Sequence, residues 1–143
     1  MKSFIRFTLL VSSLSIFFST ALLSETIIPV KVVIVSMFGN GEDTGDRPGE
    51  MQFWVERGHF DKKMDFSLGL HDLYYRNDGV LLTCTGSGVT NATASIMALG
   101  MDSRFDFSKA YYIIAGIAGA DPTDASLGAA IWAKWVVDGD LTY

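Results

Sequence analysis

An apolar run that ends in closely spaced glycines constrains the fold of this chain more than any other feature. The run Tyr111–Ala115 is followed by Gly116 and Gly119, then by an Asp-Pro turn and Gly128. A short continuous apolar run is typical of a strand that is buried on both faces of a sheet, so we expect such a strand here. The glycines allow the backbone to pass close to another segment or to a ligand.

Two further strand-like runs end in the same way. The β-branched run Val30–Ser36 predicts a central strand and is followed by Gly39 and Gly41, while Val80–Thr85 predicts another strand and is followed by Gly86-Ser87-Gly88. Ligands of open α/β sheets bind at the carboxyl ends of the strands. Three such ends in one short chain predict a single ligand cleft built on loops.

Residues 90–101 have the pattern of an amphipathic helix. Ile96 and Leu99 share one face at helical spacing, and Thr90 or Asn91 can cap the helix N-terminus. Strands that alternate with a helix favour the α/β class. We therefore expect a central mixed, mostly parallel sheet with flanking helices.

The other segments are interpreted from turns and composition. Glu50–Arg57 predicts a short helix, Phe60–His71 fits a strand or a loop, and Asn-Asp-Gly at 77–79 predicts a hairpin turn. The apolar, Trp-containing stretch Ala129–Val137 predicts a strand or an extended segment.

The N-terminus has the composition of an export signal. Lys2 and Arg6 accompany the apolar stretch Phe7–Leu23, and cleavage after Ala21 or, less well, after Ser24 fits the small-residue rule. The sequence predicts an exported protein, periplasmic or extracellular. The alternative is an uncleaved membrane anchor, since the stretch approaches the ~20 residues that span a bilayer.

Composition narrows the classes of partner. The chain has 143 residues, is 49% hydrophobic and carries a formal net charge of -5, which fits one folded domain and excludes the basic surface that nucleic acid requires. Cys84 is the sole cysteine, so an internal disulfide is excluded. A buried, inert thiol is favoured over a catalytic one, because His59 and His71 are distant in sequence.

The turn Gly86-x-Gly88-x-x-Asn91 follows a strand and opens a helix. Backbone N–H groups and the helix dipole favour an anion at such a place. The turn also resembles part of a dinucleotide fingerprint, with Asn91 in place of the third glycine and only Asp106 near the position of the ribose-binding acid. A tight turn that packs without a ligand is the equal alternative.

The polar loop Asn40–Arg47 admits two interpretations. It is acidic enough to suggest Ca²⁺, but it lacks the order of an EF-hand, so a solvated loop is favoured. Arg47 can bind a phosphate or a carboxylate if it turns inward. His59 and His71 are candidate acid–base groups, and their spacing matches no metal motif, so we expect no metal.

Several motifs together resemble the purine nucleoside permease family, which in turn resembles the nucleoside phosphorylase superfamily. They are Val-Val-Ile-Val-Ser-Met-Phe at 32–38, Asp-Arg-Pro-Gly-Glu at 46–50, Gly-Ser-Gly-Val-Thr-Asn-Ala at 86–92, Ile-Ala-Gly-Ile-Ala-Gly-Ala-Asp-Pro at 114–122, Ser-Leu-Gly at 126–128 and Trp-Val-Val-Asp-Gly-Asp-Leu at 135–141. The resemblance covers nearly all of the chain after the signal. It implies a phosphorylase-like fold, incomplete here, with a signal peptide at 1–21 and the N-terminal part of the domain at 22–143.

The resemblance implies a nucleoside site on the three glycine-rich ends. An anion or the ribose is expected near the first end, an anion at the helix N-terminus, and the base near the third end. The expected binding residues are Gly39, Asn40 and Arg47 at the first end, Ser87, Gly88 and Thr90 at the second, and Gly116 with Ala118 at the third.

Three functions remain open on this basis. The first is nucleoside binding that supports nucleoside uptake and metabolism, with a purine nucleoside as partner and a homo-oligomer as an open question. The second is an exported nucleoside phosphorylase or hydrolase, with phosphate as co-substrate and no other cofactor. In phosphorylase-like enzymes the residue that assists the leaving base comes from a later half, so we assign no catalytic residue. The third is a truncated fragment without independent activity.

Overall fold

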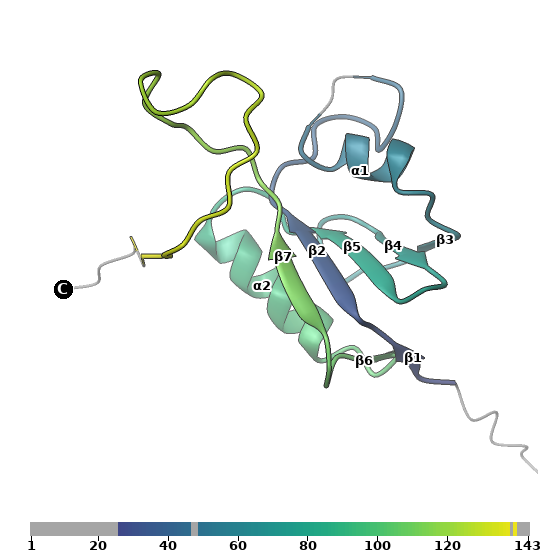
Figure 1. The fold of residues 1–143 in the computed structure, drawn as a ribbon. Helices are drawn as coiled ribbons and strands as arrows, with labels where there is room; N and C mark the ends of the chain where they lie inside the picture. The colour runs from purple at the N-terminus through teal and green to yellow at the C-terminus, as the bar shows by residue number, and fades with distance from the viewer. Residues whose placement is uncertain (1–25, 47–48, 138, 140–143) are drawn as a thin grey trace, which may run out of the picture.

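Five strands form the central sheet of the computed structural model, which describes residues 26–46, 49–137 and 139 (Figure 1). In spatial order they are β3 (Lys62–Met64), β4 (Leu73–Arg76), β5 (Val80–Cys84), β2 (Val32–Ser36) and β7 (Tyr111–Ile114). The central strand β2 is parallel to both β5 and β7, while β3–β4 and β4–β5 are antiparallel. The predicted α/β class and mixed sheet are confirmed, but parallel pairs do not predominate in this sheet.

The antiparallel pair β4–β5 is joined by the predicted Asn-Asp-Gly turn. Gly79 has a φ of 99°, a conformation that favours glycine, and its N–H donates to the carbonyl of Arg76 at 2.9 Å. The Arg76 guanidinium also contacts the Asp78 carboxylate at 2.8 Å. The hairpin prediction is confirmed, and it has a consequence for the site: residues just before β4 lie beside the carboxyl end of β5.

A second, two-stranded parallel sheet of β1 (Ile28–Pro29) and β6 (Phe105–Asp106) lies where the chain enters β2. The N–H of Val30 donates to the carbonyl of Asp106 at 2.9 Å, which holds this acid at the amino end of β2. Its carboxylate accepts the N–H of Ser108 at 2.9 Å. Asp106 therefore lies away from the glycine-rich strand ends and does not serve as the ribose-binding acid.

Two helices, α1 (Gln52–Arg57) and α2 (Val89–Gly100), occur where the sequence predicts them. The predicted cap of α2 is wrong, because Gly88 is the N-cap residue and no side chain caps this end. The Asn91 side chain instead donates to the carbonyl of Ser87 at 2.8 Å. Asn91, in the first turn of α2, thus stabilises the loop that precedes the helix.

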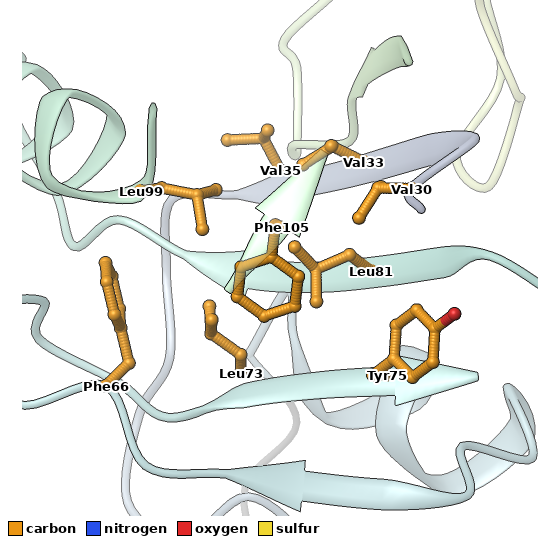
Figure 2. Close-up of a cluster of buried hydrophobic side chains, with 9 residues drawn as sticks. All are labelled: Val30, Val33, Val35, Phe66, Leu73, Tyr75, Leu81, Leu99 and Phe105. Carbon is orange, nitrogen blue, oxygen red and sulfur yellow. The ribbon is translucent and has the colours of Figure 1, made fainter. Parts of the chain in front are cut away.

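The core has two parts, one on each face of the sheet, because successive strand side chains point to opposite faces. Figure 2 shows the part on the α2 face, where Val33, Leu81 and Leu99 meet. On the other face Ile34 and Leu82 pack with Met51, just before α1. Burial of these aliphatic groups fixes the register of the parallel strands and therefore the level at which each strand ends.

The prediction that Tyr111–Ala115 is buried on both faces is wrong. β7 is an edge strand among the described residues, with Tyr111 78% and Ile114 67% exposed. After β7 the described chain forms no helix or strand, so of the two predicted alternatives for Ala129–Val137, a strand or an extended segment, the strand is not observed. Trp132 and Trp135 are exposed there. A strand needs a neighbouring strand, and no described strand pairs with this segment.

The predicted signal peptide lies outside the described residues and stays a prediction. Within the described part of the chain, helices are too short or too polar to cross a bilayer.

Candidate functional site

The three glycine-rich strand ends lie at one edge of the sheet, as the sequence predicts. The N–H of Thr85 donates to the carbonyl of Ser36 at 2.9 Å, one residue beyond the β5 strand. The N–H of Ala115 donates to the carbonyl of Val35 at 2.8 Å, one residue beyond β7. The loops after β2, β5 and β7 therefore start at nearly the same level, at one edge of the sheet.

Glu50 connects two of these loops. Its Oε2 accepts the backbone N–H groups of Met37 at 2.8 Å and Phe38 at 3.1 Å, both after β2, and its Oε1 accepts the N–H of Ile117 at 2.8 Å, after β7. The N–H of Glu50 itself donates to the carbonyl of Phe38 at 2.8 Å. Hydrogen bonds to a carboxylate are stronger than neutral ones, so one side chain holds both loops.

Gly116 lies where the loop after β7 passes close to this carboxylate. A Cβ at this position would collide with the Met37 side chain and would lie 3.2 Å from Glu50 Oε1. A larger residue here would require the Met37 side chain to move and would crowd the Glu50 carboxylate. Gly116 and Ala118 line a hollow of about 390 Å³ together with Trp54, so the structure brings both predicted residues to one place.

Gly39 is packed against a histidine that sequence reasoning did not place in the site. A Cβ on Gly39 would lie 2.7 Å from Cε1 and 3.0 Å from Nε2 of His71, and 3.5 Å from Sγ of Cys84. His71 reaches this edge because it precedes β4, which is antiparallel to β5. Cys84 is fully buried, as expected, yet it lies beside a histidine.

Asp43 organises the polar side chains around His71. Its Oδ2 accepts the Tyr74 hydroxyl at 2.6 Å and the Lys63 ammonium at 2.8 Å, and its Oδ1 lies 4.0 Å from Nδ1 of His71. Burial acts to raise the pKa of Asp43, but the hydrogen bonds from Lys63 and Tyr74 outweigh it and leave that pKa below its ordinary value. Burial and the bond to Asp43 raise the pKa of Tyr74 to about 12.

The turn before α2 is open to solvent. Ser87, Gly88 and Thr90 are exposed, and Gly86 and Gly88 have φ values of 79° and 91°. Both glycines thus adopt a conformation that other residues rarely adopt. The first N–H groups of a helix have no acceptor within the helix, so this turn presents donors at the edge of the sheet.

The remaining candidates are less well placed. Asn40 is exposed and Arg47 lies outside the described residues, so their predicted roles stay predictions. His59 follows α1, and the adjacent Gly58 carbonyl accepts a hydrogen bond from Arg76 at the far end of β4. The structure therefore separates His59 from His71.

The carboxylates of the loop after β2 are used within the protein. Asp46 accepts the N–H of Glu42 at 2.9 Å, and Asp43 binds Lys63 and Tyr74. Across the described ranges no group of three or more metal-ligating side chains is found.

Comparison with known proteins places the chain in a family. The family model described as purine nucleoside permease (NUP) matches residues 29–143. The chain belongs to the purine nucleoside permease family. A probable purine nucleoside permease of Schizosaccharomyces pombe is 47% identical over 57 residues, which is 40% of this chain and 16% of that protein. A purine nucleoside permease of Candida albicans is 35% identical over 101 residues, which is 64% of this chain and 25% of that protein.

The chain thus spans a quarter or less of the length of these family members in the aligned regions. No solved structure matches the chain. The resemblance to nucleoside phosphorylases accordingly remains a prediction about fold.

Sequence reasoning did not place Glu50, His71 and Asp43 at this edge in this family member, although it named His71 as a candidate acid–base group. Glu50 is the last residue of the Asp-Arg-Pro-Gly-Glu motif, in which Arg47 was the predicted binding residue. The Asn-Asp-Gly turn could have indicated the position of His71. A hairpin at 77–79 places the start of β4, which His71 precedes, beside the carboxyl end of β5.

Proposed function

We propose that this chain contributes a purine nucleoside binding site at the edge formed by the loops after β2, β5 and β7, and that binding supports nucleoside uptake. The observation that carries the proposal is the Glu50 carboxylate, which ties the loop after β2 to the loop after β7. Such a tie fixes the distance between two parts of a ligand site before the ligand arrives, which reduces the entropy lost on binding. The matched relatives named purine nucleoside permeases support the choice of ligand.

The chemistry of the edge suggests how the parts of a nucleoside would be distributed. Trp54 and Phe53 are partly exposed beside Gly116 and offer ring faces on which a purine can stack. The polar side chains near Gly39 suit the ribose. The turn at Gly86–Gly88 offers backbone donors to phosphate.

Isothermal titration calorimetry of the chain with inosine, adenosine and uridine tests the proposal. We expect saturable binding of both purine nucleosides and weaker binding of uridine. Gly116→Val should abolish binding, because the added side chain collides with Met37 and crowds Glu50, whereas the matched Gly119→Val has no neighbour within 4 Å to displace. If none of the three nucleosides gave a saturable heat of binding, the proposal would be refuted.

A phosphorylase or hydrolase is the second candidate, favoured by the donor-rich turn before α2. Here the N-terminus of a 12-residue helix points its free N–H groups at the same edge. Chromatography of inosine after incubation with the chain measures release of hypoxanthine. Release that requires phosphate identifies a phosphorylase, release without phosphate a hydrolase, and binding without release excludes both for this chain.

The matched relatives are much longer, so a fragment without independent activity is the third candidate. A purified polypeptide of residues 22–143 that melts cooperatively as a monomer would speak against it. We also propose export, on the composition of residues 1–21. The intact mass of the protein from its host tests this directly, since cleavage after Ala21 removes the residues that carry the signal.

A further inference from the structure

His71 has one ring nitrogen facing a carboxylate and the other facing the glycine-rich edge. Nδ1 lies 4.0 Å from Asp43 Oδ1, while Cε1 and Nε2 lie against the Gly39 backbone. Across the described residues neither ring nitrogen makes a hydrogen bond. The side chain is 24% exposed, so a ligand at the edge can reach it.

Asp43 cannot turn away from His71 without losing other contacts. Its second oxygen accepts both the Tyr74 hydroxyl and the Lys63 ammonium, from two neighbouring strands. A carboxylate held beside a histidine favours the proton on the nearer nitrogen. In the tautomer that carries its proton on Nδ1, facing Asp43, Nε2 is an acceptor.

The charges around the His71 ring determine which kind of ligand group can bind at Nε2. Lys63 bridges the Asp43 and Asp72 carboxylates at 2.8 and 3.5 Å, and the Tyr74 hydroxyl donates to Asp43. The balance is negative while His71 is neutral. An anion is disfavoured here, whereas an uncharged hydroxyl can donate a hydrogen bond to Nε2.

The absence of a side chain at Gly39 lets the His71 ring pack directly against the loop after β2. Any Cβ there would press on Cε1 and Nε2 of the ring. The ring edge is therefore covered only by backbone on this side, next to the loop that Glu50 holds in place.

We propose that His71 recognises the ribose, with Nδ1–H directed to Asp43 and Nε2 accepting a hydrogen bond from one ribose hydroxyl beside Gly39. This inference rests on the proposed nucleoside binding. It assigns the sugar, rather than phosphate or base, to the loop after β2.

The test compares inosine with 2′-, 3′- and 5′-deoxyinosine by calorimetry, in the unaltered chain and in His71→Asn. In the unaltered chain, loss of the hydroxyl that meets His71 should weaken binding roughly tenfold, about the contribution of one hydrogen bond. In His71→Asn that penalty should disappear while the other two persist. Persistence of all three penalties overturns the role of His71 and leaves nucleoside binding intact, whereas absence of inosine binding to the unaltered chain overturns both.

The matched control is His59→Asn, which changes the other histidine at the opposite edge. Its φ of 51° is one that asparagine tolerates, so the fold should be kept and all three penalties retained. A second readout does not depend on a variant that folds: the Cε1 proton of His71 should shift on addition of inosine, and that of His59 should not. A shift at His59 alone would also overturn the inference.

Discussion

Oε1 of Glu50 lies 2.8 Å from the backbone nitrogen of Ile117, although 67 positions separate the two residues in the sequence. The same side chain holds Met37 and Phe38 through its other oxygen. The loop after β2 and the loop after β7 are thus held by one carboxylate at the edge where we place the nucleoside.

Glu50→Gln should weaken both the fold and the site. An amide keeps one acceptor oxygen and replaces the other with an NH₂ group, which would face an N–H donor of Met37 or Ile117. We expect the free energy of unfolding in urea to fall by about 1–3 kcal/mol and inosine affinity to fall roughly tenfold. The exposed Glu42→Gln serves as control, and equal effects of the two changes would show that the tie has no special role.

Gly39→Ala should displace the His71 ring. The new Cβ would lie 2.7 Å from Cε1, so the ring must move away from Asp43, at a cost of about 1–2 kcal/mol in the free energy of unfolding. Gly119→Ala has no atom within 4 Å to meet and should change stability by less than about 0.5 kcal/mol.

The double variant Gly39→Ala/His71→Ala isolates this contact. Because the second change removes the ring, the double variant should lose less stability than the sum of the two single variants, with a coupling of about 0.5–3 kcal/mol. Strict additivity in denaturant unfolding would show that the two residues do not press on each other.

Tyr74 should make stability sensitive to alkaline pH. Its pKa is raised from 10.0 to about 12 in the folded state by burial and by the bond to Asp43. A raised folded pKa means that this contribution is fully present below pH 10 and is lost as pH rises through about 12.

Tyr74→Phe removes that contribution. It should lower the free energy of unfolding by about 1 kcal/mol at neutral pH, with the difference from the unaltered chain shrinking between pH 10 and 12. Tyr111→Phe, at a side chain that is 78% exposed, should leave the profile unchanged. A Tyr74→Phe profile parallel to that of the unaltered chain would refute the assigned cause.

The free edge of β7 should promote self-association of the isolated chain. Tyr111, Tyr112 and Ile114 are exposed on a strand that has no neighbour on its outer side within the described residues. Ile114→Lys should lower the mean mass in sedimentation velocity and leave the melting temperature nearly unchanged, because lysine at an edge opposes strand pairing. An unchanged mass distribution would show that the edge does not drive association.

Much of the fold could be predicted from local pattern. The β-branched runs at Val32–Ser36 and Val80–Cys84 are strands because their side chains fill both faces of a covered sheet, and the Asn-Asp-Gly turn sets the β4–β5 pairing. The sequence wrongly predicted that Tyr111–Ile114 is buried, since most of this strand is exposed. Apolar composition shows that a strand can be buried, but it does not show whether another layer covers the strand.

Of the candidate site, the sequence predicted the glycine-rich loops but not the side chains that connect them. Glycine spacing identified these loops, because Gly39 and Gly116 lie close to other side chains and Gly88 has a φ of 91°, which favours glycine. The side chains that act across those loops, Glu50 and His71, depend on pairings between distant segments. Of these pairings, the sequence indicated only the β4–β5 hairpin, which returns His71 to this edge.

The central claim is that a purine nucleoside binds at the edge formed by the loops after β2, β5 and β7. Backbone ¹H–¹⁵N spectra of the chain during a titration with inosine test it most directly. We expect saturable chemical-shift changes at Met37, Glu50, His71, Gly88 and Ile117, with little change at Asp106 on the opposite edge. Shifts confined to the region of Asp106, or no saturable shifts at all, would contradict it.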